Sequence, residues 1–164
     1  MVVFDASVLI DLFNKRLKGD RRAKLDHLVE TLQKKRTTIL IPTPALSEFM
    51  ARAGSARDEY FRKLNSSSNF RIAPFGAKAA MECALMISEA LTSGDKKAKA
   101  KTWAKAKFDW QIVAIAKSEN ATTIYSDDGD IARIGKRANI AVIKTDDLPL
   151  SASARQHHLD FNTE

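Results

Sequence analysis

The chain has 164 residues, of which 45% are hydrophobic, and its formal net charge at neutral pH is +7. This length suits a single domain, and no apolar run approaches the roughly 18 residues that a membrane-spanning helix needs. The only cysteine, Cys83, cannot form an intramolecular disulfide, which fits a protein of the reducing cytoplasm. Because no basic segment precedes the first apolar residues, we interpret the N-terminus as part of the mature fold and not as a signal peptide.

The predicted strands and helices alternate along the chain. Short β-branched or apolar runs predict strands, and apolar residues at i, i+3 and i+4 predict helices. The elements up to the middle of the chain are a strand at 2–4, helices at 7–15 and 21–36, a strand at 37–41, helices at 43–52 and 55–64, a strand at 70–74 and a helix at 77–91. The helix at 77–91 places small and apolar residues on one face, namely Ala77, Ala80, Met81, Ala84, Ser88 and Leu91.

A lysine-rich segment follows this helix and holds most of the positive charge. Residues 95–107, "DKKAKAKTWAKAK", carry six lysines and one aspartate, or +5, which leaves +2 for the rest of the chain. A local basic excess is typical of a nucleic-acid contact, although a solvated linker would have the same composition. Trp103 could stack on a base, but packing on the core is commoner for an aromatic side chain. The candidate phosphate contacts are Lys96, Lys97, Lys99, Lys101, Lys105 and Lys107.

The remaining elements continue the alternation. They are a helix at 108–118, a strand at 122–125, a helix at 131–138 and a strand at 140–143. Strands that alternate with helices predict a parallel sheet covered by helices on both faces, which is a three-layer α/β/α sandwich. We expect one domain over residues 1–148, in which 95–107 is an insertion or a helix, and a polar tail over 149–164.

Acidic side chains lie where this topology would bring them together. Asp5 directly follows the first strand, and Asp127 and Asp128 follow the fourth, so all three lie at the carboxyl edge of the sheet, where α/β proteins bind ligands. Glu48 lies one turn into its helix, and Asp109 lies in the first turn of its own helix, on a largely apolar face. A carboxylate directed toward a core is unfavourable unless it is paired or bound to a metal.

Each acid also has a simpler explanation. Asp5, Asp128 or Asp130 could cap a helix, Asp109 is favoured by the helix dipole, and Glu48 could be merely exposed. The convergence of all of them on one edge favours a shared site. Carboxylate oxygens are the ligands that Mg²⁺ and Mn²⁺ prefer, and an acidic metal site beside a basic segment indicates phosphate chemistry.

Other chemistries have little support in the sequence. The three histidines are His27, His157 and His158, and two of them lie in the tail, so neither a zinc site nor a Ser-His-Asp triad is indicated. The sequence contains neither the P-loop motif G-x-x-x-x-G-K-[ST] nor the dinucleotide-binding motif G-x-G-x-x-G. A phosphohydrolase with an aspartyl nucleophile usually has D-x-D after its first strand, whereas this chain has "DAS", with Ser7 in the second acidic position.

Four segments, "VVFDASVLIDL", "TPALSEF", "KFDWQIVAIA" and "TIYSDDGDI", resemble the four acidic motifs of PIN domains, in order, over roughly residues 1–148. In its short length, the chain is similar to VapC-type toxins of toxin–antitoxin pairs. The resemblance implies a PIN-like nuclease domain and a Mg²⁺- or Mn²⁺-dependent ribonuclease that leaves 5′-phosphates. It also implies a homodimer and a small antitoxin partner. The metal-binding and catalytic acids it implies are Asp5, Glu48, Asp109 and Asp128, with Asp130 as an accessory ligand.

Smaller roles follow from the same resemblance. Ser126 stands where the family usually has threonine, and Ser7 and Ser126 are candidates to orient the ligating carboxylates; Ser7 could instead be a helix N-cap. Asp127 falls on a variable position and is expected to face water. The lysine-rich segment is longer than expected for a minimal toxin. A non-toxin RNA-processing nuclease and a non-catalytic partner- or RNA-binding module therefore remain alternatives.

Overall fold

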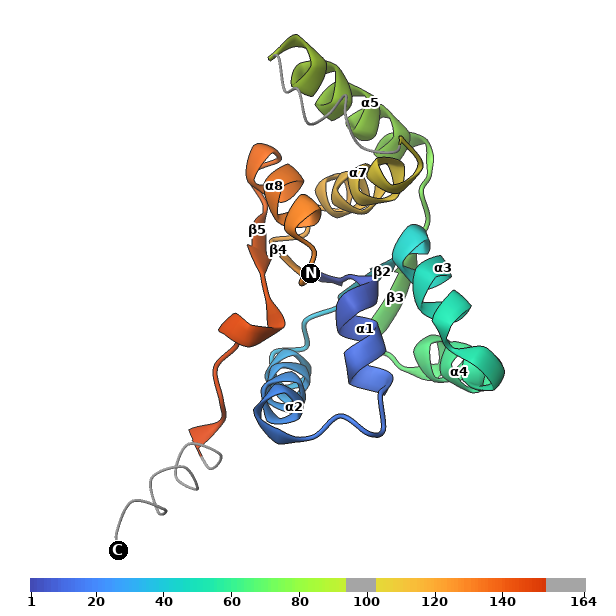
Figure 1. Ribbon diagram of the computed structural model, residues 1–164, viewed down its shortest axis with the longest axis vertical. Helices are drawn as coiled ribbons and strands as arrows, with labels where there is room; N and C mark the ends of the chain where they lie inside the picture. The colour runs from blue at the N-terminus through green and yellow to red at the C-terminus, as the bar shows by residue number, and fades with distance from the viewer. Residues whose placement is uncertain (94–102, 153–164) are drawn as a thin grey trace, which may run out of the picture.

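The computed structural model describes residues 1–93 and 103–152, and a five-stranded sheet lies at its centre (Figure 1). Every strand pairing is parallel, and the strands lie side by side in the order β3-β2-β1-β4-β5. This arrangement confirms the predicted α/β class. The strands are β1 (Val2–Phe4), β2 (Ile39–Pro42), β3 (Phe70–Ala73), β4 (Thr123–Tyr125) and β5 (Ala141–Ile143).

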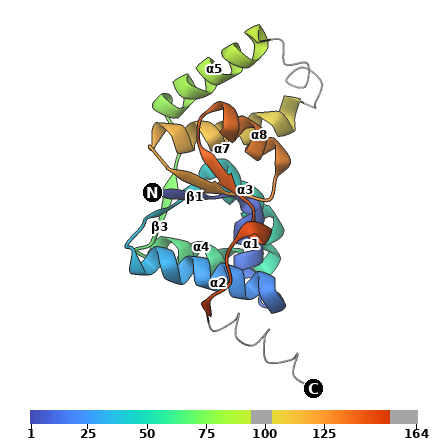
Figure 2. The same cartoon turned by 90° about the vertical axis from the view of Figure 1, so that its left-hand side faces the viewer.

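Helices cover both faces of the sheet, as predicted. In Figure 2, α5 and α7 lie on one side of the strands, and α2 and α4 lie on the other. Helix α3 contributes a buried residue to each of the two hydrophobic cores, Ala45 to one and Phe49 to the other. The described α-helices are α1 (Ala6–Phe13), α2 (Gly19–Lys34), α3 (Thr43–Arg52), α4 (Arg57–Ser66), α5 (Ala77–Thr92), α7 (Trp103–Ser118) and α8 (Gly129–Arg137), and the short 3₁₀ helices are η1 (Gly54–Ala56) and η2 (Thr145–Asp147).

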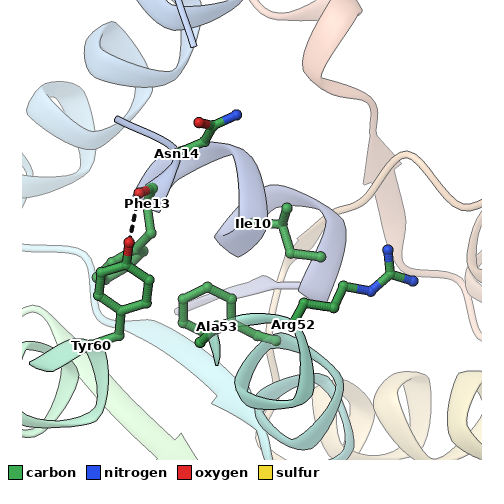
Figure 3. A pocket seen from close by; sticks show the side chains of 7 residues that line it. Ile10, Phe13, Asn14, Arg52, Ala53 and Tyr60 are labelled. Carbon is green, nitrogen blue, oxygen red and sulfur yellow. Dashed lines mark hydrogen bonds between the residues drawn. The ribbon is translucent and has the colours of Figure 1, made fainter. Parts of the chain in front are cut away.

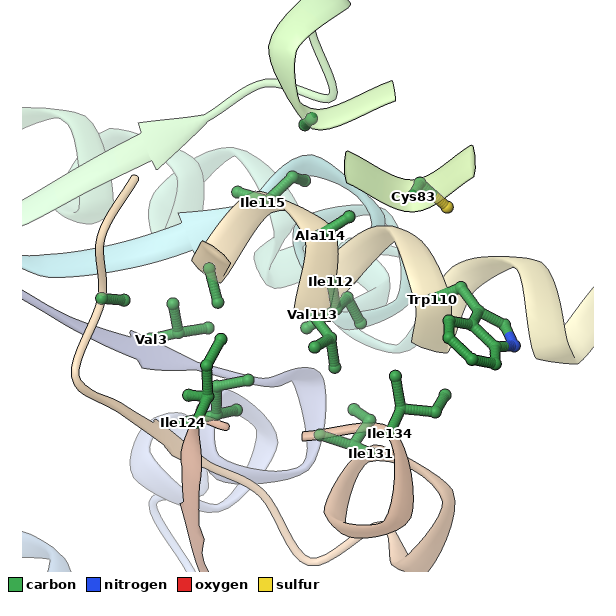
Figure 4. Packing of buried hydrophobic residues seen from close by; sticks show 14 of the residues in the cluster. Val3, Cys83, Trp110, Ile112, Val113, Ala114, Ile115, Ile124, Ile131 and Ile134 are labelled. Atoms are coloured by element: carbon green, nitrogen blue, oxygen red, sulfur yellow. The ribbon is translucent and has the colours of Figure 1, made fainter. Parts of the chain in front are cut away.

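Strands β1 and β2 are buried on both faces, because alternate side chains point to opposite sides of a strand and helices cover both sides of the sheet. Val3 and Ile124 pack in the core beneath α7 and α8 (Figure 4), whereas Val2 and Phe4 pack in the core beneath α1 and α2. Such double burial explains why β1 and β2 are continuous apolar runs, whereas the edge strand β3 includes the exposed Arg71.

Helix α7 is the most deeply buried helix of the described chain. Trp110 and the run Ile112–Ala116 are buried around its whole circumference, because α5 covers the face that the sheet leaves open. Cys83 of α5 is one of the small buried residues at this contact.

Apart from shifts of a few residues at the ends of other elements, three details differ from the predictions. The shared face of α5 that contains Met81 and Leu91 lies in solvent, and the helix packs through the residues between them, such as Cys83 and Met86. Helix α7 begins at Trp103, so that Asp109 lies in its second turn and not at its N-terminus. Helix α8 begins at Gly129, because Asp128 caps it.

Among the described residues, no helix combines the length and apolar character that a bilayer span requires. The predicted extent of the domain, residues 1–148, stays a prediction. Most of the lysine-rich segment and most of the tail lie outside the described residues.

Candidate active site

The four predicted catalytic acids line one open cleft of about 360 Å³ at the carboxyl edge of the sheet. Asp5 follows β1, Asp128 follows β4, Glu48 comes from α3 and Asp109 from α7. Strands β1 and β4 are neighbours, and the chain passes from β1 to β2 on one side and reaches β4 on the other. The cleft therefore lies where the strand order reverses, which is the usual ligand site of an open α/β sheet.

Three carboxylates in this region are close enough to share a cation. Asp109, Asp128 and Asp130 each offer an oxygen, and these oxygens all lie within 4.8 Å of one another. Asp109 is 7% exposed. Because hard divalent ions take carboxylate oxygens in clusters of this kind, the donor set fits Mg²⁺ or Mn²⁺.

Two serine hydroxyls hold the carboxylate of Asp5. Ser7 Oγ and Ser126 Oγ donate hydrogen bonds to Asp5 Oδ2, at 3.0 and 2.8 Å. Each hydroxyl also accepts a backbone N–H of the loop after β4: Ser7 from Asp127 at 3.2 Å and Ser126 from Asp128 at 3.1 Å. Each serine hydroxyl therefore links the carboxylate of Asp5 to the backbone of the loop after β4.

Burial dominates the electrostatics of Asp5, which is only 4% exposed. Desolvation raises the pKa of this carboxyl, and the hydrogen bonds from Ser126 and Ser7 oppose that rise without cancelling it. Asp5 occupies the N-cap position of α1 but its side chain makes no capping hydrogen bond, and Ser7 lies inside the helix. The N-cap alternative is therefore wrong for Ser7, whereas Asp5 does hold the N-cap position, and the backbone N–H groups of Ala6 and Ser7 help to lower its pKa.

Asp128 combines two roles. Its Oδ1 accepts the N–H of Asp130 at 2.7 Å, which makes it the N-cap of α8, while its carboxylate also borders the cleft. The predicted alternative of Asp130 as a cap is wrong, because Asp130 lies in the first turn of α8. There it forms a 3.8 Å ion pair with Arg133 as well as joining the three-carboxylate cluster.

Asp127 does not simply face water, so that prediction is wrong. Its Oδ1 accepts the N–H of Thr145 at 2.8 Å, and its Oδ2 accepts the Thr145 hydroxyl at 3.1 Å and a hydrogen bond from Arg21. Burial by itself would raise the pKa of Asp127, but the hydrogen bonds from Thr145 and Arg21 outweigh it and hold the pKa below its ordinary value. Arg21 also binds Asp11 and Asp146, so one guanidinium ties α1, α2 and η2 to the active-site loop.

Glu48 is the most exposed of the four acids. Its side chain is 52% exposed and forms a 3.1 Å ion pair with Arg52, one helical turn away. Glu48 is thus exposed, as its simpler explanation assumed, but it also lines the cleft, so its predicted role as a metal ligand stays a prediction.

The sequence profile of the PIN domain matches residues 2–137 of this chain. The chain belongs to the PIN domain family. The predicted resemblance is therefore confirmed over most of the sequence, while no curated protein matches the chain.

Solved structures of toxin–antitoxin proteins share this PIN fold. VapBC2 from Rickettsia felis, bound to a promoter DNA fragment, is 21% identical with a TM-score of 0.59, and the match covers 88% of this chain and 98% of that chain. DNA-bound VapBC from Salmonella typhimurium is 15% identical with a TM-score of 0.57, covering 88% and 97%. VapC20 from Mycobacterium tuberculosis, described as a Sarcin-Ricin loop cleaving toxin, is 15% identical with a TM-score of 0.56, covering 82% and 95%. At these identities the likeness establishes the fold alone.

Sequence reasoning missed three residues around the acidic cleft of this PIN domain. Arg52 and Phe108 line the cleft, and Arg21 binds Asp127. The i, i+4 spacing of Glu48 and Arg52 and the position of Phe108 beside Asp109 were available signals, whereas nothing local pairs Arg21 with Asp127.

An apolar pocket adjoins the cleft and shares Ile10 and Arg52 with it. Figure 3 shows this pocket between α1, α3 and α4, with Tyr60 donating a hydrogen bond to the carbonyl of Phe13. The rings of Phe13 and Tyr60 lie 4.9 Å apart. The pocket is thus a neighbour of the acidic cleft and is lined in part by aromatic rings.

The lysine-rich segment contributes little that can be compared with the predictions. Lys107 is exposed near the start of α7. The side chains of Trp103 and Lys105, and the residues Lys96, Lys97, Lys99 and Lys101, lie outside the part of the chain that the structure describes.

Proposed function

We propose that this protein is a metal-dependent endoribonuclease that hydrolyses RNA phosphodiester bonds. The convergence of Asp5, Glu48, Asp109 and Asp128 from four different elements on one cleft carries the proposal. A non-catalytic member would be free to lose some of these acids, and this chain has all four.

The proposed metal ligands are Asp5, Glu48, Asp109, Asp128 and Asp130, binding one or two Mg²⁺ or Mn²⁺ ions directly or through water. A divalent ion at such a site makes bound water acidic and neutralises the charge of a phosphate. Ser7 and Ser126 fix the orientation of Asp5, since both hydroxyls donate to the same oxygen. The cap formed by Asp128 fixes its own carboxylate at the N-terminus of α8.

We further propose that the protein is the toxin of a type II toxin–antitoxin pair and acts as a homodimer in the cytoplasm. The shared fold with the VapBC complexes and with VapC20 supports this proposal. A small antitoxin that occupied the apolar pocket between α1, α3 and α4 would also reach the acidic cleft, because Ile10 and Arg52 line both the pocket and the cleft. The six lysines of residues 95–107 are proposed contacts to RNA phosphates.

Cleavage of RNA by the purified protein tests the nuclease proposal. We expect cleavage in Mg²⁺ or Mn²⁺, none in EDTA, and none by Asp5→Asn. Asp58→Asn is the matched control, because Asp58 is exposed on α4 and does not line the cleft. Cleavage that persists in EDTA, or in Asp5→Asn, would contradict the assignment.

Expression in cells separates a toxin from a non-toxin nuclease of the same chemistry. We expect growth arrest on expression, relieved by Asp5→Asn and by co-expression of a small protein encoded next to this gene. Normal growth during production of a protein that cleaves RNA in vitro would instead indicate an RNA-processing enzyme.

A further inference from the structure

The cleft has an apolar wall as well as acids. Its lining includes five carboxyl groups and one guanidinium, that of Arg52, but also Ile10, Ile131 and Phe108. Such a surface is suited to a ligand that is charged at one end and apolar at the other. A nucleotide has this character, because its phosphate is anionic and the faces of its base are apolar.

Phe108 is the unusual member of this wall. Its side chain is 52% exposed although it directly precedes the buried Asp109 on α7. Single exposed apolar residues are common and need no explanation, and Phe61 of α4 is similarly exposed at 43%. Among the large hydrophobic residues exposed in the described chain, however, only Phe108 lines the acidic cleft.

We propose that the ring of Phe108 stacks on an unpaired nucleobase next to the scissile phosphate. The inference rests on the proposed ribonuclease function and specifies its substrate. The carboxylates repel the RNA backbone wherever no cation intervenes, so affinity in the cleft has to come partly from non-electrostatic contacts. Stacking of bases on aromatic side chains supplies such a contact, and it tolerates any base because every base has a π-face.

The proposed contact restricts the class of RNA. In a double helix each base is stacked on both sides and is inaccessible to a protein ring, whereas bases of loops, bulges and single strands are accessible. The cleft is therefore expected to select an unpaired nucleotide and to disfavour a continuous duplex.

Binding experiments with single-stranded probes test the proposal, in an Asp5→Asn background that prevents cleavage. The probes are a fluorescent oligouridine, an abasic strand with the same backbone, and a blunt RNA duplex, all in Mg²⁺. We expect Phe108→Ala to weaken oligouridine binding about 5- to 150-fold, the usual range for loss of one aromatic–base stack. Phe108→Tyr, which keeps the ring, should bind like the parent, and so should the control Phe61→Ala.

Two further readouts separate stacking from a structural role. The abasic strand should bind weakly to the parent and be insensitive to Phe108→Ala. The slope of affinity against salt should not change in Phe108→Ala, because no phosphate contact is lost. Equal binding by Phe108→Ala and the parent, an equal loss on the abasic strand, or preference for the duplex would overturn the proposal. If Phe108 served a protein partner, the RNA measurements would not change, which is the first of these outcomes.

The proposal can fail independently of the nuclease activity. If the wild-type protein cleaves RNA and Phe108→Ala binds oligouridine normally, the nuclease proposal stands and the stacking proposal fails. A wild-type protein that cleaves nothing, but whose oligouridine affinity depends on the ring as expected, would retain the base-binding site without the hydrolysis.

Discussion

Arg21 is expected to stabilise the active-site loop, and Arg21→Met tests this by removing the charge while keeping most of the side-chain length. The guanidinium donates to Asp11 at 2.7 Å, to Asp146 at 2.9 Å and to Asp127. The backbone N–H of Asp127 donates a hydrogen bond to Ser7 Oγ, and Ser7 Oγ donates one to Asp5. Loss of Arg21 should therefore destabilise the domain and loosen the loop that carries Asp128.

The exposure of the three partners sets the size of the effect. The side chains of Asp11 and Asp127 are 20% and 25% exposed, whereas that of Asp146 is 79% exposed and contributes almost nothing. Charged hydrogen bonds contribute about 1.5–3 kcal/mol when shielded, so with partial screening we assign about 1 kcal/mol to each of the first two. A total of about 2 kcal/mol corresponds to a melting temperature about 4–8 °C lower for a chain of this size.

Thermal unfolding followed by circular dichroism measures this difference. Lys63→Met is the control, because Lys63 forms an exposed 2.7 Å ion pair with Glu59 and its loss should shift the melting temperature by at most about 2 °C. The pKa of Asp127 is lowered in the folded protein, so its contribution is present at neutral pH and is lost as the pH falls below the ordinary value of 3.8. Equal melting temperatures of Arg21→Met and Lys63→Met at neutral pH would refute this reasoning. So would a difference in melting temperature between Arg21→Met and the wild type that becomes larger in acid.

Three substitutions test the acids themselves. Burial raises the pKa of Asp5, so the ionised carboxylate destabilises the folded protein when no metal is bound. Asp5→Asn should therefore raise the melting temperature in EDTA at neutral pH. This gain in melting temperature should vanish as the pH falls toward 3.8, the ordinary pKa of the group. Asp128→Asn should abolish RNA cleavage, whereas Asp127→Asn should retain much more activity and instead lower the melting temperature by about 1–3 °C, since Asn keeps only part of the bonds to Arg21 and Thr145. Initial cleavage rates and melting curves of both variants measure this, and the reverse order of activities would mean that the acid motif is misread by one residue.

The strands and most helices could be predicted from the sequence, because the spacing of apolar residues determines which side of each element is buried. Strands such as Val2–Phe4 are short apolar runs ended by a polar residue, and the core faces of helices such as α2 follow the i, i+3, i+4 rule. The packed face of α5 was harder to predict, because alanines occur on several sides of that helix. Which side is buried depends on where α7 lies, and that is a property of the tertiary structure.

Asp5 and Asp128 were predictable because the carboxyl ends of parallel strands meet at one edge of a sheet, whereas Glu48 and Asp109, which lie on helices, were assigned through the resemblance to the PIN motifs. The partners of Asp127 were not predictable, since Arg21 lies 106 residues away and Thr145 lies beyond another helix. Without them Asp127 resembled a solvated neighbour of Asp128. The exposure of Phe108 was equally hard to predict from the sequence, because Trp110, two residues later, is also aromatic and is buried.

The distribution of counter-charges explains how one cleft tolerates so many carboxylates. Asp127 is balanced by Arg21 and Glu48 by Arg52, while Asp5 is held by hydroxyls and disfavoured as an anion by burial. The oxygens of Asp109, Asp128 and Asp130 lie within 4.8 Å of one another, close enough for like charges to repel, and the 3.8 Å ion pair between Asp130 and Arg133 offsets part of this repulsion. Any ion that binds the folded state and not the unfolded chain relieves this repulsion and stabilises the fold by mass action. Relief of the repulsion that Arg133 leaves is the physical basis of the affinity for a divalent cation that we propose for this cluster.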